Sequence, residues 1–211
     1  MENQLMNLEL PHLAALAAAL GWASGMRLYA VVFITGAAGF MGWVPLPSGL
    51  QLLQHPVVLG ASFLMFLIEF VADKIPGVDT LWDTLHTVIR IPAGAALAAG
   101  VMGGDSATWT LVAALMGGTL AATSHTAKVT TRAAVNTSPE PFSNIALSLA
   151  GDAAVPLMLW LAYEHPMWFW PALALSVVLA LVLIVILFKF LRSLVQRVSS
   201  WGGGRMASPG M

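Results

Sequence analysis

Six long apolar stretches constrain what this chain can fold into. They cover residues 13–43, 57–75, 81–102, 108–134, 142–163 and 168–191. About 20 apolar residues in a helix cross a bilayer, so each of the last five stretches suits one crossing, and the first is too long for a single simple one. Lipid leaves no partner for an open backbone, so these segments are expected to be helical. We predict an all-α, polytopic membrane helix bundle with about six spans. It forms one domain over residues 1–198, followed by a flexible cytoplasmic tail, residues 199–211.

The composition excludes other classes of protein. Apolar residues make up 58% of the chain and charged residues 9%, against about 45–50% and about 25% in soluble domains. Nine Lys and Arg face ten Asp and Glu. No basic excess is present to neutralise a nucleic acid, so we expect no nucleic-acid partner. The chain has no cysteine, which excludes disulfides, thiolate metal sites and cysteine nucleophiles.

The positive charges predict how the chain lies in the membrane. The connections 44–56, 103–107 and 164–167 contain no Lys or Arg. Seven basic residues collect on the other side: Lys74, Lys128, Arg132, Lys189, Arg192, Arg197 and Arg205. By the positive-inside rule this predicts a multi-pass membrane protein with both termini cytoplasmic. An alternative keeps these connections but folds residues 8–22 as an interfacial or re-entrant piece.

Several residues predict broken or kinked helices. The first apolar stretch is interrupted by Gly21-Trp-Ala-Ser-Gly25, followed at once by Arg27, and prolines stand inside the third and fifth stretches, at Pro92 and Pro156. A proline leaves a carbonyl one turn earlier without its helical partner. Ser24-x-x-Arg27 also resembles Ser124-x-x-x-Lys128. This pairing suggests the hypothesis of a three-plus-three inverted repeat, a common transporter plan.

Ionisable residues inside apolar spans carry most of the functional information, because such groups are costly in hydrocarbon and usually face a cavity or one another. Asp79, Asp83, His86 and Arg90 are separated by four, three and four residues. In a helix this spacing puts them on one face.

A second polar stripe, Glu140, Asn144, Ser148 and Asp152, has a spacing of four residues. Asp152 lies near the middle of its stretch, where a carboxylate is most expensive. Pro156 removes the helical partner of the Asp152 carbonyl. The fifth stretch therefore predicts a cation or proton site at Asp152, facing the bundle interior and paired with Arg27 or Arg90.

The charges of the whole set nearly balance. Five cations and six acids lie in or beside the spans, which predicts a mutually paired network lining the cytoplasmic half. The alternative is that many of these charged side chains lie among lipid headgroups or form ion pairs that only hold helices together. We assign the following residues to a substrate or ion pathway: Arg27, Glu69, Asp73, Asp83, His86, Arg90, His125, Lys128, Arg132, Asn144, Ser148 and Asp152.

Three segments are familiar: Gly21–Tyr29, Glu69–Gly94 and Ala134–Asn144. They resemble a family of small polytopic bacterial inner-membrane proteins known only as a domain of unknown function. The resemblance covers most of residues 15–190. It implies a compact all-helical membrane domain and no particular activity, so the polar stripes have to carry the functional argument.

Three classes of function fit these features. The leading hypothesis is a small-solute or ion transporter, or a channel-like carrier, with a buried charged site and no cofactor. An alternative is an intramembrane Mg²⁺-dependent enzyme acting on a lipid or prenyl-phosphate headgroup, with Asp79 and Asp83 as metal ligands. A third is a non-catalytic membrane assembly factor. The expected partners are membrane lipids and an unknown small solute or ion, and a homodimer stays open because six short helices make a thin bundle.

Overall fold

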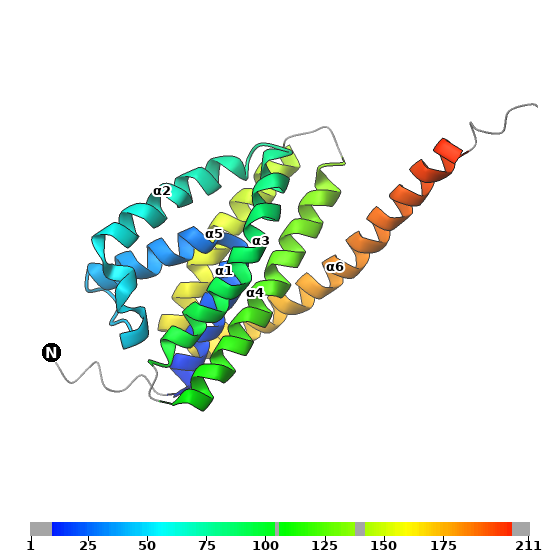
Figure 1. The fold of residues 1–211 in the computed structure, drawn as a ribbon. Coiled ribbons are helices and arrows are strands. Elements are labelled where there is room, and N and C mark those ends of the chain that lie inside the picture. The colour runs from blue at the N-terminus through cyan, green and yellow to red at the C-terminus, as the bar shows by residue number, and fades with distance from the viewer. Residues whose placement is uncertain (1–9, 104–105, 138–141, 204–211) are drawn as a thin grey trace, which may run out of the picture.

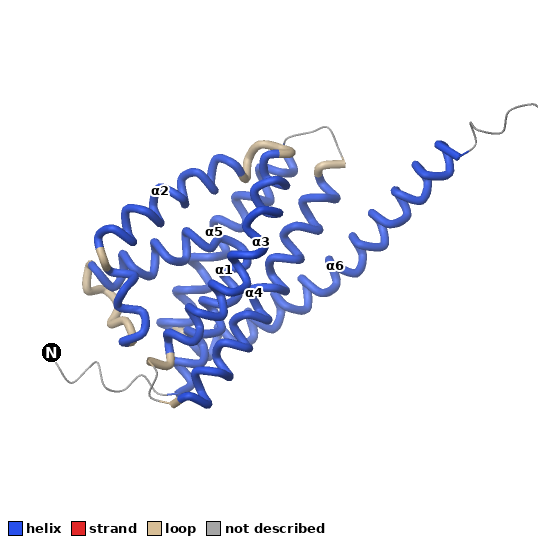
Figure 2. The backbone as a smooth tube through the Cα atoms, in the orientation of Figure 1, coloured by secondary structure: helices blue, strands red, loops and turns tan. Residues whose placement is uncertain are grey.

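The computed structural model describes residues 10–103, 106–137 and 142–203, and in them every regular element is a helix (Figures 1 and 2). The helices are α1 (Leu10–Phe40), the short 3-10 helix η2 (Ser48–Gln54), α2 (Pro56–Ala72), α3 (Val78–Val101), α4 (Ala107–Val135), α5 (Phe142–Glu164) and α6 (Pro166–Gly203). The all-α prediction is confirmed. Each of the last five apolar stretches corresponds to one helix.

Four helices are long and apolar enough to cross a membrane: Leu10–Phe40, Val78–Val101, Phe142–Glu164 and Pro166–Ser193. Taken together, η2 and α2 also meet this criterion, although they are bent by 70° at their junction. The chain is therefore a helical membrane protein with four to five candidate spans. The sequence missed η2, which lies in the connection 44–56. Helix α6 also continues to Gly203, into the proposed tail, and residues 204–211 lie outside the described residues.

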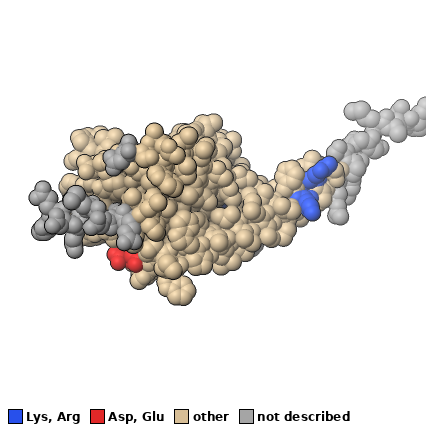
Figure 3. All heavy atoms as spheres, turned by 90° about the horizontal axis from the view of Figure 1, so that it is seen from below, with Lys and Arg blue, Asp and Glu red and all other residues tan. Residues whose placement is uncertain are grey.

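The molecule is polar inside and apolar outside. Among the described residues, only Glu164, Lys189 and Arg192 are exposed charged residues. Figure 3 shows a surface almost free of charged side chains apart from one acidic spot and the basic end of α6. Large apolar side chains cover the outer faces, such as Val88 at 76% exposure. This arrangement suits hydrocarbon, in which exposed charge is expensive.

Helix α1 is broken in its middle, at Arg27, whose φ of −148° and ψ of 74° are not helical. Before the break, α1 runs parallel to α4: Gly21 lies against Gly117, and Gly25 against Ala121 and Ser124. A β-carbon at Gly21 or Gly25 would collide with α4, so these glycines allow the two helices to touch.

After the break, α1 folds back. Gly36 contacts Leu53 and Gly39 contacts Gln54, while Gly49 of η2 lies against Gly100 near the end of α3. Both ends of α1 therefore lie toward the end of the bundle where α3 ends and α4 begins (Figure 1). Sequence analysis held a re-entrant or interfacial course as an alternative for residues 8–22 only, whereas the fold-back involves the whole of α1, Leu10–Phe40.

The fold-back bears on two expectations. Helix α6 runs parallel to α4, because Leu173 lies beside residues 115–120 of α4 and Ser176 to Leu183 lie beside residues 124–132, so Leu10 and Gly203 lie at opposite ends of the bundle (Figure 1). The side of the membrane on which each terminus lies stays a prediction. An inverted repeat of three and three would also place the first and fourth helices in opposite directions, whereas the first half of α1 runs parallel to α4.

The prolines do not break the helices that contain them. Helix α3 continues through Pro92 and α5 through Pro156. The expected broken helix exists, but its break is at Arg27. Glycines and a buried charge mark this position, whereas a proline is tolerated inside a membrane helix because its surroundings satisfy the freed backbone groups.

Candidate functional site: a buried charge network

Asp73 is the centre of the buried charges. It is the C-cap residue that follows α2, and its exposure is 0%. Its carboxylate pairs with Arg27 of α1, with Lys128 of α4 at 3.0 Å and with Arg132 of α4 at 3.1 Å. Three cations from two helices thus converge on one acid, and the network ties the end of α2 to α1 and α4.

Asp83 is a second acid shared by several cations. It lies 2.8 Å from Lys128, 3.2 Å from Arg90 and 3.4 Å from Arg132. The predicted one-faced stripe on α3 is confirmed, because all four of its members are buried: Asp79, Asp83, His86 and Arg90. A stripe of this kind presents its charges to α1 and α4 instead of to lipid.

Arg90 holds the break in α1. Its Nη1 donates to the carbonyl oxygens of Gly25, at 3.2 Å, and Met26, at 3.1 Å, while its Nη2 donates to Glu69 of α2. A helix break frees carbonyls that need other donors in a dry interior. The guanidinium supplies donors to two carbonyls and a carboxylate at once, from the two ends of a planar, rigid group that the single ammonium of a lysine lacks.

Asp152 is paired with Arg27, as the sequence predicts, and not with Arg90. Its carboxylate lies 2.8 Å from Arg27 and 3.2 Å from Lys74, and its side chain is 16% exposed. Ser148, one turn earlier, accepts hydrogen bonds from Arg27 at 2.9 Å and Lys74 at 3.4 Å. Asn144 donates to the carbonyl of Asp73 at 3.5 Å. The stripe on α5 therefore faces the network, although its first member, Glu140, lies outside the described residues.

The carboxylate of Asp79 is held by hydrogen bonds and an ion pair within the protein. Its Oδ1 accepts from the backbone amides of Gly77 at 2.8 Å and Thr80 at 2.6 Å and from Asn136 at 3.1 Å, and Arg132 lies 3.2 Å from its Oδ2. With Asp83 facing cations as well, both proposed Mg²⁺ ligands already have partners. Within the described residues, no group of three or more His, Asp or Glu side chains is arranged to hold a metal ion.

The two histidines of the proposed pathway differ in position. His125 is buried, with Nδ1 3.3 Å from the Gly25 carbonyl and Nε2 2.8 Å from Thr87 Oγ1. It therefore contacts the break in α1. His86 stacks on Trp82 with ring centroids 4.1 Å apart and contacts the Trp82 carbonyl. It has no ion pair among the described residues, so it lies beside the network.

All ten of these charged groups belong to one connected set, which we call the charge network. It contains five cations and five acids: Arg27, Lys74, Arg90, Lys128 and Arg132 with Glu69, Asp73, Asp79, Asp83 and Asp152. Its formal charge is zero when every group is ionised. The balance seen in the sequence therefore reflects direct pairing.

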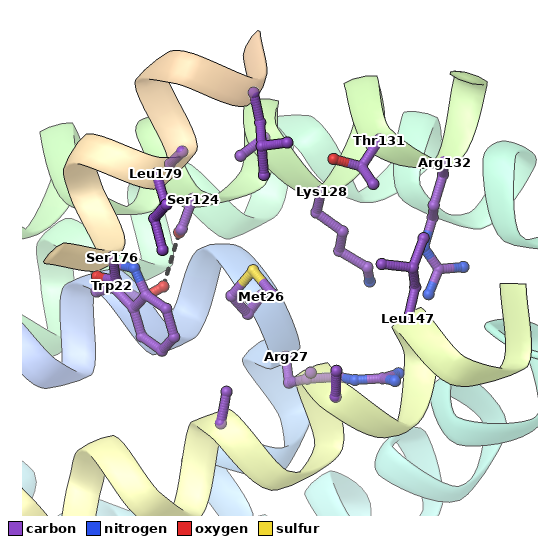
Figure 4. A pocket seen from close by; sticks show the side chains of 16 residues that line it. Trp22, Met26, Arg27, Ser124, Lys128, Thr131, Arg132, Leu147, Ser176 and Leu179 are labelled. Carbon is purple, nitrogen blue, oxygen red and sulfur yellow. Dashed lines mark hydrogen bonds between the residues drawn. The ribbon is translucent and has the colours of Figure 1, made fainter. Parts of the chain in front are cut away.

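A cavity of about 280 Å³ borders the charge network on one side. It lies between α1, α4, α5 and α6 (Figure 4), and most of its wall is apolar. Among the described residues, the charged ones that line it are all cations: Arg27, Lys128 and Arg132. Sequence analysis missed this cavity, because its outer wall depends on where α6 packs. The one usable signal is the run of small residues Ala150, Gly151 and Ala154 on α5.

Comparison with known proteins gives a family but no activity. No curated protein and no solved structure matches the chain. Residues 14–187 match a family model described as a domain of unknown function, DUF4126. This match covers all the helices that build the charge network and most of α6. The chain therefore belongs to the DUF4126 family.

Proposed function

We propose that this protein is a membrane carrier for a small solute or ion, and that the charge network is its working site. One observation carries the proposal: Arg27 lies at the break of a buried helix and pairs there with acids from two other helices, Asp73 and Asp152. Broken helices that place charges inside a bundle are typical of transport pathways.

The cost of the charge network supports a function beyond packing. Burying an ion pair costs desolvation energy, and well-packed apolar residues of similar volume often stabilise a protein as much or more. Here ten charged groups are gathered in one place in a chain of 211 residues. A bundle that needed only stability would gain little from them, so we attribute their presence to exchange of charged partners.

Several members of the charge network have more than one ion-pair partner, which would help the network to exchange one partner for a bound ion or proton. Asp152 is shared by Arg27 and Lys74, and Lys128 is shared by Asp73 and Asp83. When a bound ion or proton neutralises Asp152, Arg27 keeps Asp73 as an acidic partner, and Lys74 keeps its hydrogen bonds to Ser148 and to the Phe70 carbonyl. Moving charge through such a set avoids the large penalty of a buried unpaired ion.

The same arrangement supports a topology for the carrier. Lys74 and Arg132 lie at the end of the bundle that carries the α2–α3 and α4–α5 connections, and Lys189 and Arg192 lie on the last part of α6. The positive-inside rule makes this side cytoplasmic in a bacterial inner membrane. We propose that α2 to α6 cross the membrane, α4 included although it is not one of the candidate spans named above. We also propose that α1, although a candidate span, is re-entrant from the outer side. Five crossings then replace the six expected from the sequence.

The test is flux through the purified protein in liposomes that contain a pH-sensitive dye. Gradients of Na⁺, K⁺, chloride, phosphate and small carboxylates are imposed in turn. We expect a protein-dependent flux of at least one of these that Asp152→Asn abolishes while the variant still inserts as wild type. Glu164→Gln serves as the matched control, because Glu164 is exposed and outside the charge network. Equal flux in wild type and Asp152→Asn would contradict the proposal.

A further inference from the structure

We propose that the cavity between α1, α4, α5 and α6 binds an anionic phospholipid of the surrounding bilayer. The phosphate lies beside Arg27, Lys128 and Arg132, and an acyl chain fills the apolar part. This inference goes beyond the carrier function and stands whether or not the protein moves a solute. It is carried by the charge, the depth and the opening of the cavity.

The charge at the cavity has one sign. The three charged residues that line it are cations, and their acidic partners, such as Asp73 and Asp83, do not line it. The charge network is neutral as a whole, but its cations face the cavity and its acids do not. An anion placed there meets nitrogen donors first, as phosphate groups prefer. Thr131 adds a hydroxyl at the same end (Figure 4).

The cavity changes from polar to apolar in the direction a lipid requires. Arg132 lies in the last turn of α4, and Lys128 lies one turn deeper. Ser124 and Trp22 border the part farther along α4 (Figure 4), and Arg132 to Ser124 spans about 12 Å of helix. A lipid of the nearer leaflet would thus place its headgroup at the basic end and its chain toward the middle of the membrane.

The cavity lies beside the place where the bundle opens to lipid. Helix α6 packs against α4 up to Ala180, and no described residue of α6 beyond Ala180 is buried. From there α6 diverges from the bundle (Figure 1), and Leu183 is the last residue of α6 that lines the cavity. Ala150 of α5 is exposed and also lines it. A bilayer lipid can therefore enter sideways between α5 and α6.

The size and the lining of the cavity fit one acyl chain and its headgroup phosphate better than they fit a free polar solute. A volume of about 280 Å³ is near the lower end for small-molecule sites. Leu147, Ala154, Leu179 and Leu183 supply apolar wall. A small inorganic anion would leave this wall uncovered, whereas an acyl chain buries it.

The experiment is native mass spectrometry of the purified protein in detergent, titrated with phosphatidylglycerol or with phosphatidylcholine of the same chains. Lys128 and Arg132 also hold the bundle together, so the charge requirement is tested on the ligand. We expect about tenfold tighter binding of phosphatidylglycerol, which corresponds to about 1.4 kcal/mol, because its headgroup carries a net negative charge and the phosphatidylcholine headgroup does not. Equal binding of the two lipids, or equally tight binding of diacylglycerol, would overturn the basic headgroup site.

A variant locates the binding. Ala150→Trp fills the mouth of the cavity without touching the charge network, and we expect it to lose the preference for phosphatidylglycerol. Ala153→Trp is the matched control, because Ala153 is exposed on the same helix and does not line the cavity. Unchanged preference in Ala150→Trp would overturn the proposed location. If inorganic phosphate binds to the protein and neither lipid does, the ligand of the cavity is not a lipid. None of these outcomes depends on whether the protein transports a solute.

Discussion

The guanidinium of Arg27 lies 2.8 Å from the carboxylate of Asp152, and it pairs at the same time with Asp73. The two acids come from different helices and differ in burial: Asp73 is fully buried, whereas the Asp152 side chain is 16% exposed. Arg27 therefore has one partner fixed in the protein interior and one near its edge. For the proposed carrier, this difference separates a structural part of the charge network from the part expected to exchange partners.

The two acids should respond differently to loss of charge. Asp73→Asn leaves three cations without their shared partner, so we expect a loss of about 3–5 kcal/mol in the free energy of unfolding, typical of a broken buried pair. Asp152→Asn leaves Arg27 with Asp73 and Ser148, so a loss of about 1–3 kcal/mol is expected. Thermal unfolding in detergent, followed by tryptophan fluorescence, measures both. If Asp152→Asn proves the more damaging change, the division of roles is wrong.

The contact between α1 and α4 gives a prediction about glycine. A β-carbon at Gly21 would collide with the backbone of Gly117. Backbone cannot yield as a side-chain tip can, so Gly21→Ala should destabilise the protein by about 1–3 kcal/mol, as overpacked sites do. Gly60→Ala is the control, because a β-carbon there meets open space. In the middle of a helix that change should be neutral or stabilise by up to about 1 kcal/mol. Similar melting temperatures for the two variants would contradict the close α1–α4 contact.

Local patterns in the sequence predicted the helices and the inward face of α3 well. The spacing of Asp79, Asp83, His86 and Arg90 is a property of one helix, and all four are indeed buried. The pairing of Asp152 with Arg27 was also expected, because two isolated charges deep in apolar segments need each other. These features follow from periodicity and from the cost of charge in lipid.

Features that depend on contacts between helices were not accessible. Hydropathy gives the length of an apolar segment but not the direction in which the chain runs. It could not decide whether the 31 residues of α1 continue in one direction or fold back. The direction is set by Gly21 and Gly25 packing on α4 and by Gly36 and Gly39 packing near η2. The cavity likewise depends on α6, whose apolar pattern is nearly uniform and does not indicate which face packs.

The pair of Glu69 and Arg90 lends itself to a double-mutant cycle. Arg90→Met leaves Glu69 buried without its cation, so it should cost about 3–5 kcal/mol. Glu69→Gln leaves Arg90 paired with Asp83, so a smaller cost of about 1–3 kcal/mol is expected. The double variant should cost less than the sum, with a coupling energy of about 0.5–3 kcal/mol. It should not return to wild type, because Arg90 also supplies hydrogen bonds to the carbonyls of Gly25 and Met26. Strict additivity in thermal unfolding would show that the pair is not coupled.

The re-entrant course of α1 makes a sharp prediction about which residues share a side of the membrane. The chain has no cysteine, so single cysteines at exposed positions can be labelled with an impermeant thiol reagent in intact cells. Leu10, Gln51, Glu164 and Thr137 are exposed. If α1 returns to the end at which it begins, Leu10→Cys should label together with Gln51→Cys and Glu164→Cys. Thr137→Cys, in the connection after α4, should label only after the cells are opened. A single crossing by α1 would instead place Leu10 with Thr137, because Gln51 and Leu10 would then lie on opposite sides. Protection of Leu10→Cys in intact cells, with Gln51→Cys labelled, would therefore contradict the re-entrant helix and restore the six-span arrangement.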